Sequence, residues 1–386
     1  MAGCLPSIPV ETPWWQDIRP VVESARLRFG IDVTILRLLS TEILGCVGGE
    51  VTYLAEVPAG FDTNALPIEP WSGQLDDHAL RLPYAKPGGP ARDLAWAKGI
   101  LLEQGYEMVG EPVQVRTWNL SSIWSIPVSG QNVWLKVVPP FFGHEGALIE
   151  QLAGNPVPTL IGRDGCRTLL AEVPGQDLYE TDLPTQKAMV ELLVDLQSKW
   201  MGRVEELASI GLPDWRGGNL QRQLEELLEL RESEVSAEDR STLSRFISEL
   251  PARRSQIADC GLGDTLVHGD FYSGNLRGDG SKLTLIDWGD IGIGPPLLDQ
   301  SAFLERVAEG DIAEVRDHWA DLWRRAIPGC DPMRASELVR PIAAAQRALN
   351  YQMFLDNIEP SERVYHWCDP ANWLHQTALE CGARTI

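Results

Sequence analysis

Basic residues are scarce in this sequence: its 386 residues include 33 Lys and Arg against 55 Asp and Glu, for a formal net charge of −22 at pH 7. Binding to the backbone of a nucleic acid needs a basic surface, so this balance argues against nucleic acid as the main partner. Most of the carboxylates are expected to be spread over the surface as solubilising charge. The same acidity also suits a cationic substrate.

Paired cysteines and long apolar runs are missing as well. None of the seven cysteines belongs to a C-x-x-C pair, which argues against a zinc site and a dithiol redox motif. An odd number of scattered cysteines is typical of free thiols in a reducing compartment. No stretch approaches the roughly 20 continuous apolar residues of a membrane span, and the first residues do not resemble a signal peptide. We therefore expect a cytoplasmic protein with no membrane partner.

The apolar content of 44% predicts a folded chain, and its length predicts two or three domains. In the first part, residues 13–29 have a helical pattern, residues 33–39 and 50–57 read as strands, and residues 91–104 read as a helix. We expect residues 1–107 to form an appended N-terminal α/β domain.

The rest of the chain has two different patterns. Three runs rich in Val, Ile and Trp predict strands, followed by a helix near 143–153; the runs are residues 113–119, 123–127 and 133–138. Beyond residue 176 apolar residues recur at helical spacing, for example Met189, Leu193 and Leu196. The prediction is an α+β protein with a sheet-containing lobe at 108–175 and a mainly helical lobe at 176–386.

Two segments interrupt the helical part with chemically active residues. LVHGDFYSGNL (266–276) places Asn275 five residues after Asp270, and LTLIDWGD (283–290) places Asp287 at the end of a strand-like run. Phosphoryl transfer needs a carboxylate to orient and deprotonate the acceptor hydroxyl, and oxygen ligands to hold Mg²⁺ against the phosphates. The D-x-x-x-x-N spacing is that of a kinase catalytic loop. The alternative is that the two segments are ordinary loops whose aspartates only cap neighbouring elements.

Together these segments resemble the aminoglycoside phosphotransferase and choline kinase superfamily, which shares the bilobal protein-kinase-like fold. The similarity includes the downstream GPPLLD (294–299) and extends over about residues 108–386. It implies an ATP-dependent enzyme with Asp270 as catalytic base and with Asn275 and Asp287 as Mg²⁺ ligands. His268 resembles a loop-bracing residue of this superfamily.

The upstream parts of the chain fit the same resemblance. VWLKVV (133–138) resembles the third strand of a kinase N-lobe, so Lys136 is expected to bind the α- and β-phosphates of ATP. Lysine rarely lies on an apolar strand without a partner. Glu150 on the same expected helix is the competitor, but Glu145 is the preferred partner because Glu150, five residues later, lies on a different face.

Two further segments are expected at the nucleotide. Glu172 and Val173 resemble the hinge between kinase lobes, whose backbone would hydrogen-bond adenine, although an ordinary strand-to-turn junction would look alike. No G-x-G-x-x-G occurs between the first two strands of the lobe. The corresponding turn contains Ser121 and Ser122, whose N–H and hydroxyl groups are expected to approach phosphate.

The substrate assignment comes from the C-terminal part. The segment 346–363, with Trp367 after it, is similar to bacterial glucosamine kinases that carry an N-terminal cap domain, which implies phosphorylation of the 6-hydroxyl of glucosamine. An amino sugar is cationic and favours carboxylates with an aromatic platform. Gln352, Asp356 and Glu359 would share one helical face if the helix continues, with Trp367 as the platform. A solvated acidic helix end is the alternative, and the loop 290–299 is the next candidate.

Several alternatives remain open from sequence. The acceptor could be an aminoglycoside antibiotic, or a sugar as in maltose kinases, because these molecules would bind to pockets with similar features. From another class, the chain could be a catalytically inactive kinase-fold binding module. The presence of the lysine, base, asparagine and aspartate argues against inactivity. The partner is expected to be a small molecule, and the sequence does not determine the oligomeric state.

Overall fold

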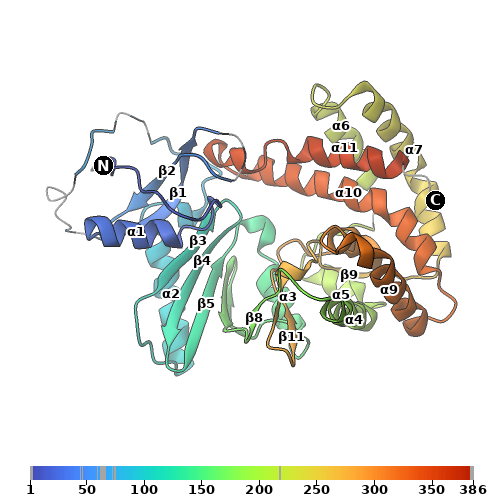
Figure 1. Cartoon of the computed structure of the whole chain (residues 1–386), viewed down its shortest axis with the longest axis horizontal. Coiled ribbons are helices and arrows are strands. Elements are labelled where there is room, and N and C mark those ends of the chain that lie inside the picture. Colours follow the sequence, from blue (N-terminus) through green and yellow to red (C-terminus); the bar gives the residue numbers. More distant parts are fainter. Residues whose placement is uncertain are drawn as a thin grey trace. The chain divides into compact units, whose positions relative to one another are not determined.

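The computed structural model describes residues 3–382 apart from residues 44, 46, 59, 61–66, 72, 74, 217 and 218. The described chain divides into two compact units. The first unit comprises residues 1–146, 160–172 and 354–367, and the second comprises residues 147–159, 173–353 and 368–386. The mixture of helix and sheet confirms the predicted fold class (Figure 1).

The first unit contains a five-stranded antiparallel sheet with the strand order β3-β4-β5-β7-β6. The strands are β3 (Val113–Trp118), β4 (Ser121–Val128), β5 (Gln131–Val137), β6 (Leu160–Asp164) and β7 (Arg167–Ala171). The hairpin of β3 and β4 pairs Trp118 with Ser121 and Val113 with Ser125. The three strand runs expected between residues 113 and 138 are therefore present as successive neighbours.

The N-terminal residues form a hairpin, β1 (Thr34–Thr41) with β2 (Val51–Glu56), and two helices, α1 (Arg19–Phe29) and α2 (Gly89–Glu103). Helix α1 begins six residues after the expected start at residue 13, because Pro20 lies in its first turn, where a missing N–H costs nothing. The amide of Gln114 on β3 accepts from the N–H of Ile35 at 2.9 Å and donates to its carbonyl oxygen at 2.8 Å. This buried amide joins the hairpin to the sheet.

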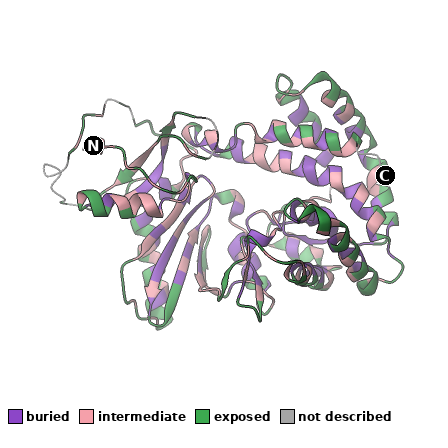
Figure 2. Ribbon diagram, viewed as in Figure 1, coloured by how far each residue is buried: buried purple, intermediate pink, exposed green. Residues whose placement is uncertain are grey.

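Residues on both sides of the expected boundary at 107 share one hydrophobic core. Tyr84, Ala97 and Leu101 pack in the same buried cluster as Trp124 and Leu135 of the sheet. Figure 2 shows the buried stretches of these elements in purple. The division into an N-terminal domain of residues 1–107 and two lobes remains a prediction, and α2 contributes directly to the core beneath the sheet.

A segment from near the C-terminus completes the first unit. Residues 354–367 include a short 3-10 helix at Pro360–Tyr365. The guanidinium of Arg81 donates to Oε2 of Glu359 at 2.9 and 2.8 Å and to Oε1 at 3.2 Å, and Arg37 lies 3.8 Å from the same carboxylate. The N–H of Leu38 donates to Glu362 at 2.8 Å. This segment is therefore bound to the N-terminal hairpin by buried polar contacts.

The second unit is mainly helical. Its longer helices are α4 (Leu183–Trp200), α6 (Asn219–Leu230), α7 (Ala237–Asp259), α9 (Ile312–Ala326), α10 (Pro332–Asn357, which ends in the first unit) and α11 (Asp369–Gly382), and its shorter ones are α5 (Val204–Ser209) and α8 (Gln300–Leu304). The helix α3 (Glu145–Gln151) runs from the first unit into the second. None of the helices that the structure describes combines the length and apolar character needed to cross a bilayer.

Short strands in the second unit carry the two motif segments. Strand β9 (Thr265–Val267) pairs with β12 (Gly292–Gly294), and β10 (Leu276–Gly278) lies between β11 (Leu283–Leu285) and β8 (Gln176–Asp177). The loops that follow β9 and β11 contain Asp270 and Asp287. Aromatic rings pack behind them, with Phe271 stacked on Phe303 at 5.0 Å between ring centroids.

Candidate active site

The predicted lysine–glutamate pair is present in the first unit. Lys136 on β5 donates through Nζ to Oε1 of Glu145, the first residue of α3, at 2.7 Å. Glu145 is 2% exposed, whereas Glu150 lies on the exposed side of the same helix. The preference for Glu145 over Glu150 as the partner is therefore confirmed. A paired, nearly buried lysine ammonium is held in a fixed position.

The turn before β4 differs from the sequence expectation. Ser121 and Ser122 lie inside the strand and not in the turn, because their backbone pairs with Trp118 and Thr117 of β3. Both side chains are buried. The hydroxyl of Ser121 accepts from the indole N–H of Trp118 at 3.1 Å. That of Ser122 accepts from Trp124 at 3.2 Å. The hydroxyl oxygens thus already have donors within the protein.

The two residues expected at the hinge lie at the junction between the compact units. Glu172 ends the first unit's stretch 160–172, and Val173 begins the second unit's stretch 173–353. Each is engaged within its own unit: Glu172 accepts from the indole N–H of Trp134 at 2.7 Å, and the carbonyl oxygen of Val173 accepts from Arg277 at 3.2 Å. The role of these two residues as an adenine-binding hinge remains a prediction.

The loop of the first motif is held by a buried carboxylate. Asp299 accepts from the backbone N–H of His268 at 3.0 Å and of Gly269 at 2.8 Å. Gln197 donates to the same carboxylate at 2.9 Å. Burial raises the pKa of Asp299 to about 7, while the two N–H donors act in the opposite direction. Because Asp299 belongs to GPPLLD (294–299), that segment braces the loop from 30 residues downstream.

Glycine is required immediately before Asp270. Gly269 has φ +84°, a conformation that L side chains rarely adopt. A Cβ at this position would lie 2.0 Å from the carbonyl oxygen of Asp290. His268, just upstream, is fully buried, and a ring nitrogen lies 3.1 Å from the carbonyl oxygen of Ile286. These contacts agree with a bracing role for His268.

Asp270 and Asn275 interact directly. The amide nitrogen of Asn275 donates to the carbonyl oxygen of Asp270 at 2.8 Å and to its carboxylate at 2.9 Å. Burial raises the pKa of Asp270 first of all, and the negative charge of Asp287 raises it further. Arg347 and the Asn275 hydrogen bond act in the opposite direction. The carboxylate is thus oriented, and its affinity for a proton is increased, as a general base requires.

Asp287 has an unusual backbone. With φ 62°, it is the single non-glycine residue of the described chain in the left-handed region. Strained backbone of this kind concentrates at functional sites, where the surrounding structure maintains it. The next residue, Trp288, is fully buried and donates to the carbonyl oxygen of Leu285 at 2.9 Å. Packing of the buried Trp288 side chain stabilises the unusual backbone at Asp287, whose own side chain is exposed.

The donor chemistry of this cluster suits a hydrated Mg²⁺. Asp287 supplies carboxylate oxygens, and Asn275 supplies its amide oxygen because its nitrogen is used by Asp270. These are the oxygen donors that Mg²⁺ prefers. Within the described ranges no group of three His, Cys, Asp or Glu is placed to hold a metal. Coordination by one or two protein oxygens, substrate phosphates and water fits, whereas an all-protein cage does not.

The expected acceptor face on residues 352–359 is wrong in its geometry. Helix α10 ends at Asn357, ahead of Pro360, so Glu359 does not share a helical face with Gln352 and Asp356. The carboxylate of Glu359 is buried against Arg81 and Arg37.

Gln352 and Asp356 are one turn apart on α10 and share a face, but the Gln352 side chain is already engaged. The amide oxygen of Gln352 accepts from Arg231 at 2.6 Å. Asp356 and Trp367 are exposed and belong to the first unit, whereas Gln352 belongs to the second. The expectation that the helix continues through Glu359 is therefore wrong, and Glu359 is used in an ion pair.

Sequence reasoning assigned no site role to a charged and aromatic group beside Asp270 in the second unit. Arg347 on α10 lies over the ring of Trp373 on α11, 4.4 Å from its centroid. Burial raises the pKa of Tyr351, and the negative charges of Asp369, Asp290 and Asp270 raise it further. Three carboxylates therefore act on one phenol. Arg347 and Tyr351 are four residues apart in QRALNY (346–351), so they lie on one face of α10. This spacing is the signal that the sequence offered.

The comparisons with known proteins agree with this architecture. The family model described as "Phosphotransferase enzyme family" matches residues 136–335, just over half of the chain. No curated protein sequence is a significant match.

Solved structures share the fold. The macrolide 2'-phosphotransferase type I is 14% identical with a TM-score of 0.53, covering 73% of this chain and 96% of that one. The choline kinase from Cryptosporidium parvum Iowa II is 13% identical with a TM-score of 0.51, covering 73% and 95%. The macrolide 2'-phosphotransferase MphH from Brachybacterium faecium is 14% identical with a TM-score of 0.50, covering 76% and 99%.

Proposed function

Because this chain belongs to the phosphotransferase enzyme family, we propose that it transfers the γ-phosphate of ATP to a hydroxyl group of an amino sugar, with glucosamine as the first candidate. A phosphotransferase with a hydroxyl acceptor is what the family and the kinase-fold neighbours indicate. The single observation that carries the catalytic assignment is the oriented Asp270, fixed by Asn275 at 2.9 Å with Asp287 close enough to raise its pKa.

The roles follow from the charge that phosphoryl transfer must handle. Asp270 accepts the proton of the acceptor hydroxyl as the oxygen attacks the γ-phosphorus, and the bond to the β-phosphate oxygen breaks. Lys136, oriented by Glu145, binds the α- and β-phosphates. Asn275 and Asp287 would hold Mg²⁺, which neutralises the charge developing on the phosphate oxygens when bound. Backbone groups of Glu172 and Val173 would bind adenine, and Ser121 and Ser122 would support the turn nearest the phosphates.

The acceptor class is argued from charge. Asp270, Asp290 and Asp369 raise the pKa of Tyr351 and Arg347 lowers it, so three negative charges and one positive charge act on this region of the second unit. A negative potential of this kind favours an ammonium group on the acceptor over a neutral sugar. Trp373, already covered by Arg347 at 4.4 Å, is an aromatic surface in the same neighbourhood. Aminoglycosides carry the same ammonium groups and are therefore the second candidate.

A substrate panel tests the proposal. ADP release should be measured with glucosamine, glucose, maltose, N-acetylglucosamine and kanamycin as acceptors, with and without Mg²⁺. Glucosamine should give the highest kcat/KM, and N-acetylglucosamine should be much poorer because acetylation removes the charge. Higher activity with kanamycin would assign an aminoglycoside acceptor, and higher activity with maltose a neutral sugar. Absence of ADP release with every acceptor would favour an inactive binding module.

Two variants test the acceptor site directly. Asp290→Asn and Asp369→Asn should raise KM for glucosamine by about tenfold or more each, because each removes a charge-assisted interaction worth on the order of 1.5–3 kcal/mol. KM for ATP should change little. Asp356→Asn, an exposed change in the other unit, is the matched control. Loss of glucosamine affinity in Asp356→Asn alone would instead place the acceptor at the residues first expected from sequence.

A further inference from the structure

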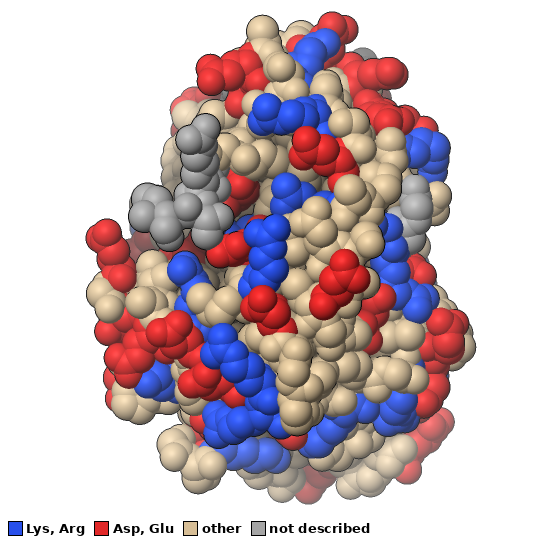
Figure 3. Space-filling view, turned by 90° about the vertical axis from the view of Figure 1, so that its right-hand side faces the viewer, with Lys and Arg blue, Asp and Glu red and all other residues tan. Residues whose placement is uncertain are grey.

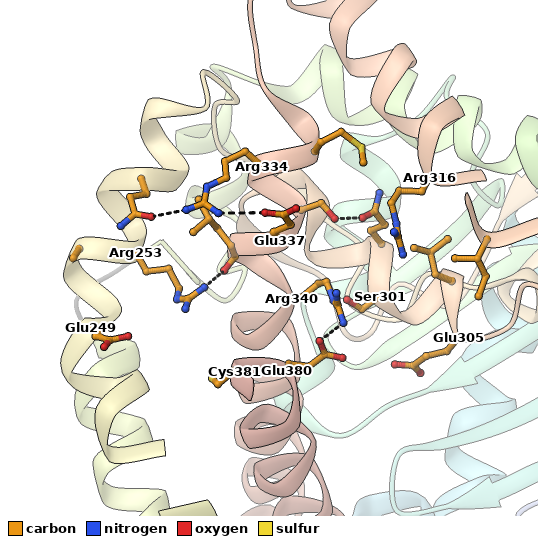
Figure 4. Close-up of a pocket in the computed structure, with 18 residues that line it drawn as sticks. Glu249, Arg253, Ser301, Glu305, Arg316, Arg334, Glu337, Arg340, Glu380 and Cys381 are labelled. Atoms are coloured by element: carbon orange, nitrogen blue, oxygen red, sulfur yellow. Dashed lines mark hydrogen bonds and ion pairs between the residues drawn. The ribbon is translucent and has the colours of Figure 1, made fainter. Parts of the chain in front are cut away.

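Charged side chains of the second unit are balanced within local groups. A cavity of about 840 Å³ among its helices is lined by four arginines and four glutamates. Figure 4 shows pairs among them, with Glu337 beside Arg334 and Glu380 beside Arg340. Acidic and basic side chains are also interspersed over the face in Figure 3. The first unit differs, because buried polar groups from separate parts of the chain meet at one turn.

That turn, between β3 and β4, consists of Asn119 and Leu120, because β3 ends at Trp118 and β4 begins at Ser121. Two-residue hairpin turns normally place one or both of their residues at positive φ, which matches the twist of the two strands. Neither Asn119 nor Leu120 has a positive φ. The turn is therefore not of the types that a hairpin favours by itself, and its geometry needs support from elsewhere in the fold.

Asn119 supplies this support through its buried side chain. Its amide nitrogen donates to the carbonyl oxygen of Glu362 at 3.1 Å, and its amide oxygen lies 3.2 Å from Nε2 of His366, which is also buried. The reversed amide would place its oxygen against the carbonyl oxygen of Glu362, so Nε2 of His366 carries the hydrogen and donates. Both ends of the amide are thus satisfied by residues 243 and 247 positions later in the chain.

The segment that receives this amide is itself fixed to the N-terminal hairpin. Oε1 of Glu362 accepts from the N–H of Leu38 on β1 at 2.8 Å, so Glu362 binds the hairpin through its side chain and the turn through its main chain. Tyr365 packs edge-on against Trp15 and Trp118, with ring centroids 5.6 Å apart in both pairs. Buried contacts therefore run without interruption from the N-terminal hairpin to the turn.

We propose that Asn119 and residues 360–366 form a clasp that fixes this turn for binding the phosphates of the nucleotide, and that the hairpin of β1 and β2 serves to hold the clasp. The inference rests on the proposed function, in which this turn lies nearest the phosphates of ATP. Backbone N–H groups bind phosphate more tightly when they are already fixed, because less conformational freedom is lost on binding. The clasp thus takes the place of the glycine-rich loop that the sequence lacks. Asn119 and His366 act through the turn and are positioning residues.

Nucleotide binding distinguishes a role at the turn from a general loss of structure. Isothermal titration calorimetry on the full chain with Mg²⁺ should compare AMP-PNP, a non-hydrolysable analogue of ATP, with adenosine, which has no phosphates. Asn119→Ala should weaken AMP-PNP binding by about tenfold and leave adenosine binding unchanged, because only the phosphates meet the turn. His366→Phe, which keeps an aromatic ring without the N–H donor, should act in the same way. His366→Gln retains an N–H donor and should restore most of the affinity.

The matched control is Gln114→Ala. Gln114 is buried on the same strand β3, and its amide makes two hydrogen bonds to Ile35 at the end of the strand away from the turn. Its loss should lower thermal stability without weakening AMP-PNP binding. The inference is refuted if Asn119→Ala and His366→Phe bind AMP-PNP as the wild type does, or if they lose AMP-PNP and adenosine affinity together. A wild-type chain that binds no AMP-PNP would overturn the proposed function itself, and the clasp with it.

Discussion

Replacing Glu362 by glutamine should remove a pH dependence of stability from the first unit. The Glu362 carboxyl group is buried, with Oε1 accepting from the N–H of Leu38 at 2.8 Å and Oε2 lacking a hydrogen-bond partner. Burial raises its pKa from 4.5 to about 8. The neighbouring charge of Glu359 acts in the same direction, and Arg37 and the N–H donor oppose it. Glu362 is therefore protonated in the folded protein at neutral pH.

The direction of the change in unfolding free energy with pH follows from the number of protons that the folded and unfolded states bind. Between pH 4.5 and about 8 the folded chain keeps this proton and the unfolded chain loses it. The free energy of unfolding therefore falls as pH rises through that window, by up to about 1.4 kcal/mol per pH unit. Over two units inside the window the loss is about 2.7 kcal/mol. Above about pH 8 the folded state also ionises and the loss stops.

Glutamine is neutral throughout and has nearly the same shape. Because the protonated carboxyl already places an O–H donor at a position without an acceptor, the amide N–H₂ adds little cost. Urea unfolding followed by tryptophan fluorescence should give similar stabilities for Glu362→Gln and wild type at the acidic end. At a pH two units higher, the variant should be more stable than the wild type by about 2.7 kcal/mol. Glu103→Gln, an exposed change on α2, should follow the wild type. Parallel profiles for Glu362→Gln and wild type would show that Glu362 is ionised throughout.

The remaining predictions concern catalysis. Asp270→Asn should fold and bind ATP but lose about 10²–10⁴ in kcat, and retention of more than about a tenth of the turnover would exclude it as the base. Asp287→Ala should abolish Mg²⁺-dependent ADP release, whereas Asn275→Ala should reduce it less because water can replace one ligand; a Mg²⁺ titration of both distinguishes them. Lys136→Ala should raise KM for ATP and lower kcat with little change in thermal stability, and a large loss of stability with unchanged kinetics would make Lys136 structural.

The sequence alone predicted the residues of the candidate site, and it determined much of the local structure. Lys136 lies on a strand and pairs with Glu145, because nine residues span one strand end, a short turn and the first turn of a helix. Asp270 and Asn275 meet because five residues close a single loop. Family, fold class and the strands of the sheet followed from patterns of this kind, in which the interacting groups are neighbours in the chain.

Only the tertiary structure decided where distant residues meet. Glu359, expected at the acceptor, lies 278 residues from Arg81 and is neutralised by it. Asp299 stabilises the loop before Asp270 through N–H groups 30 and 31 residues away. A carboxylate has the same sequence signature whether it faces substrate, water or an arginine. Which of these it meets depends on the packing of segments far apart in the chain, because burial and charge partners, not residue type, determine its protonation and its role.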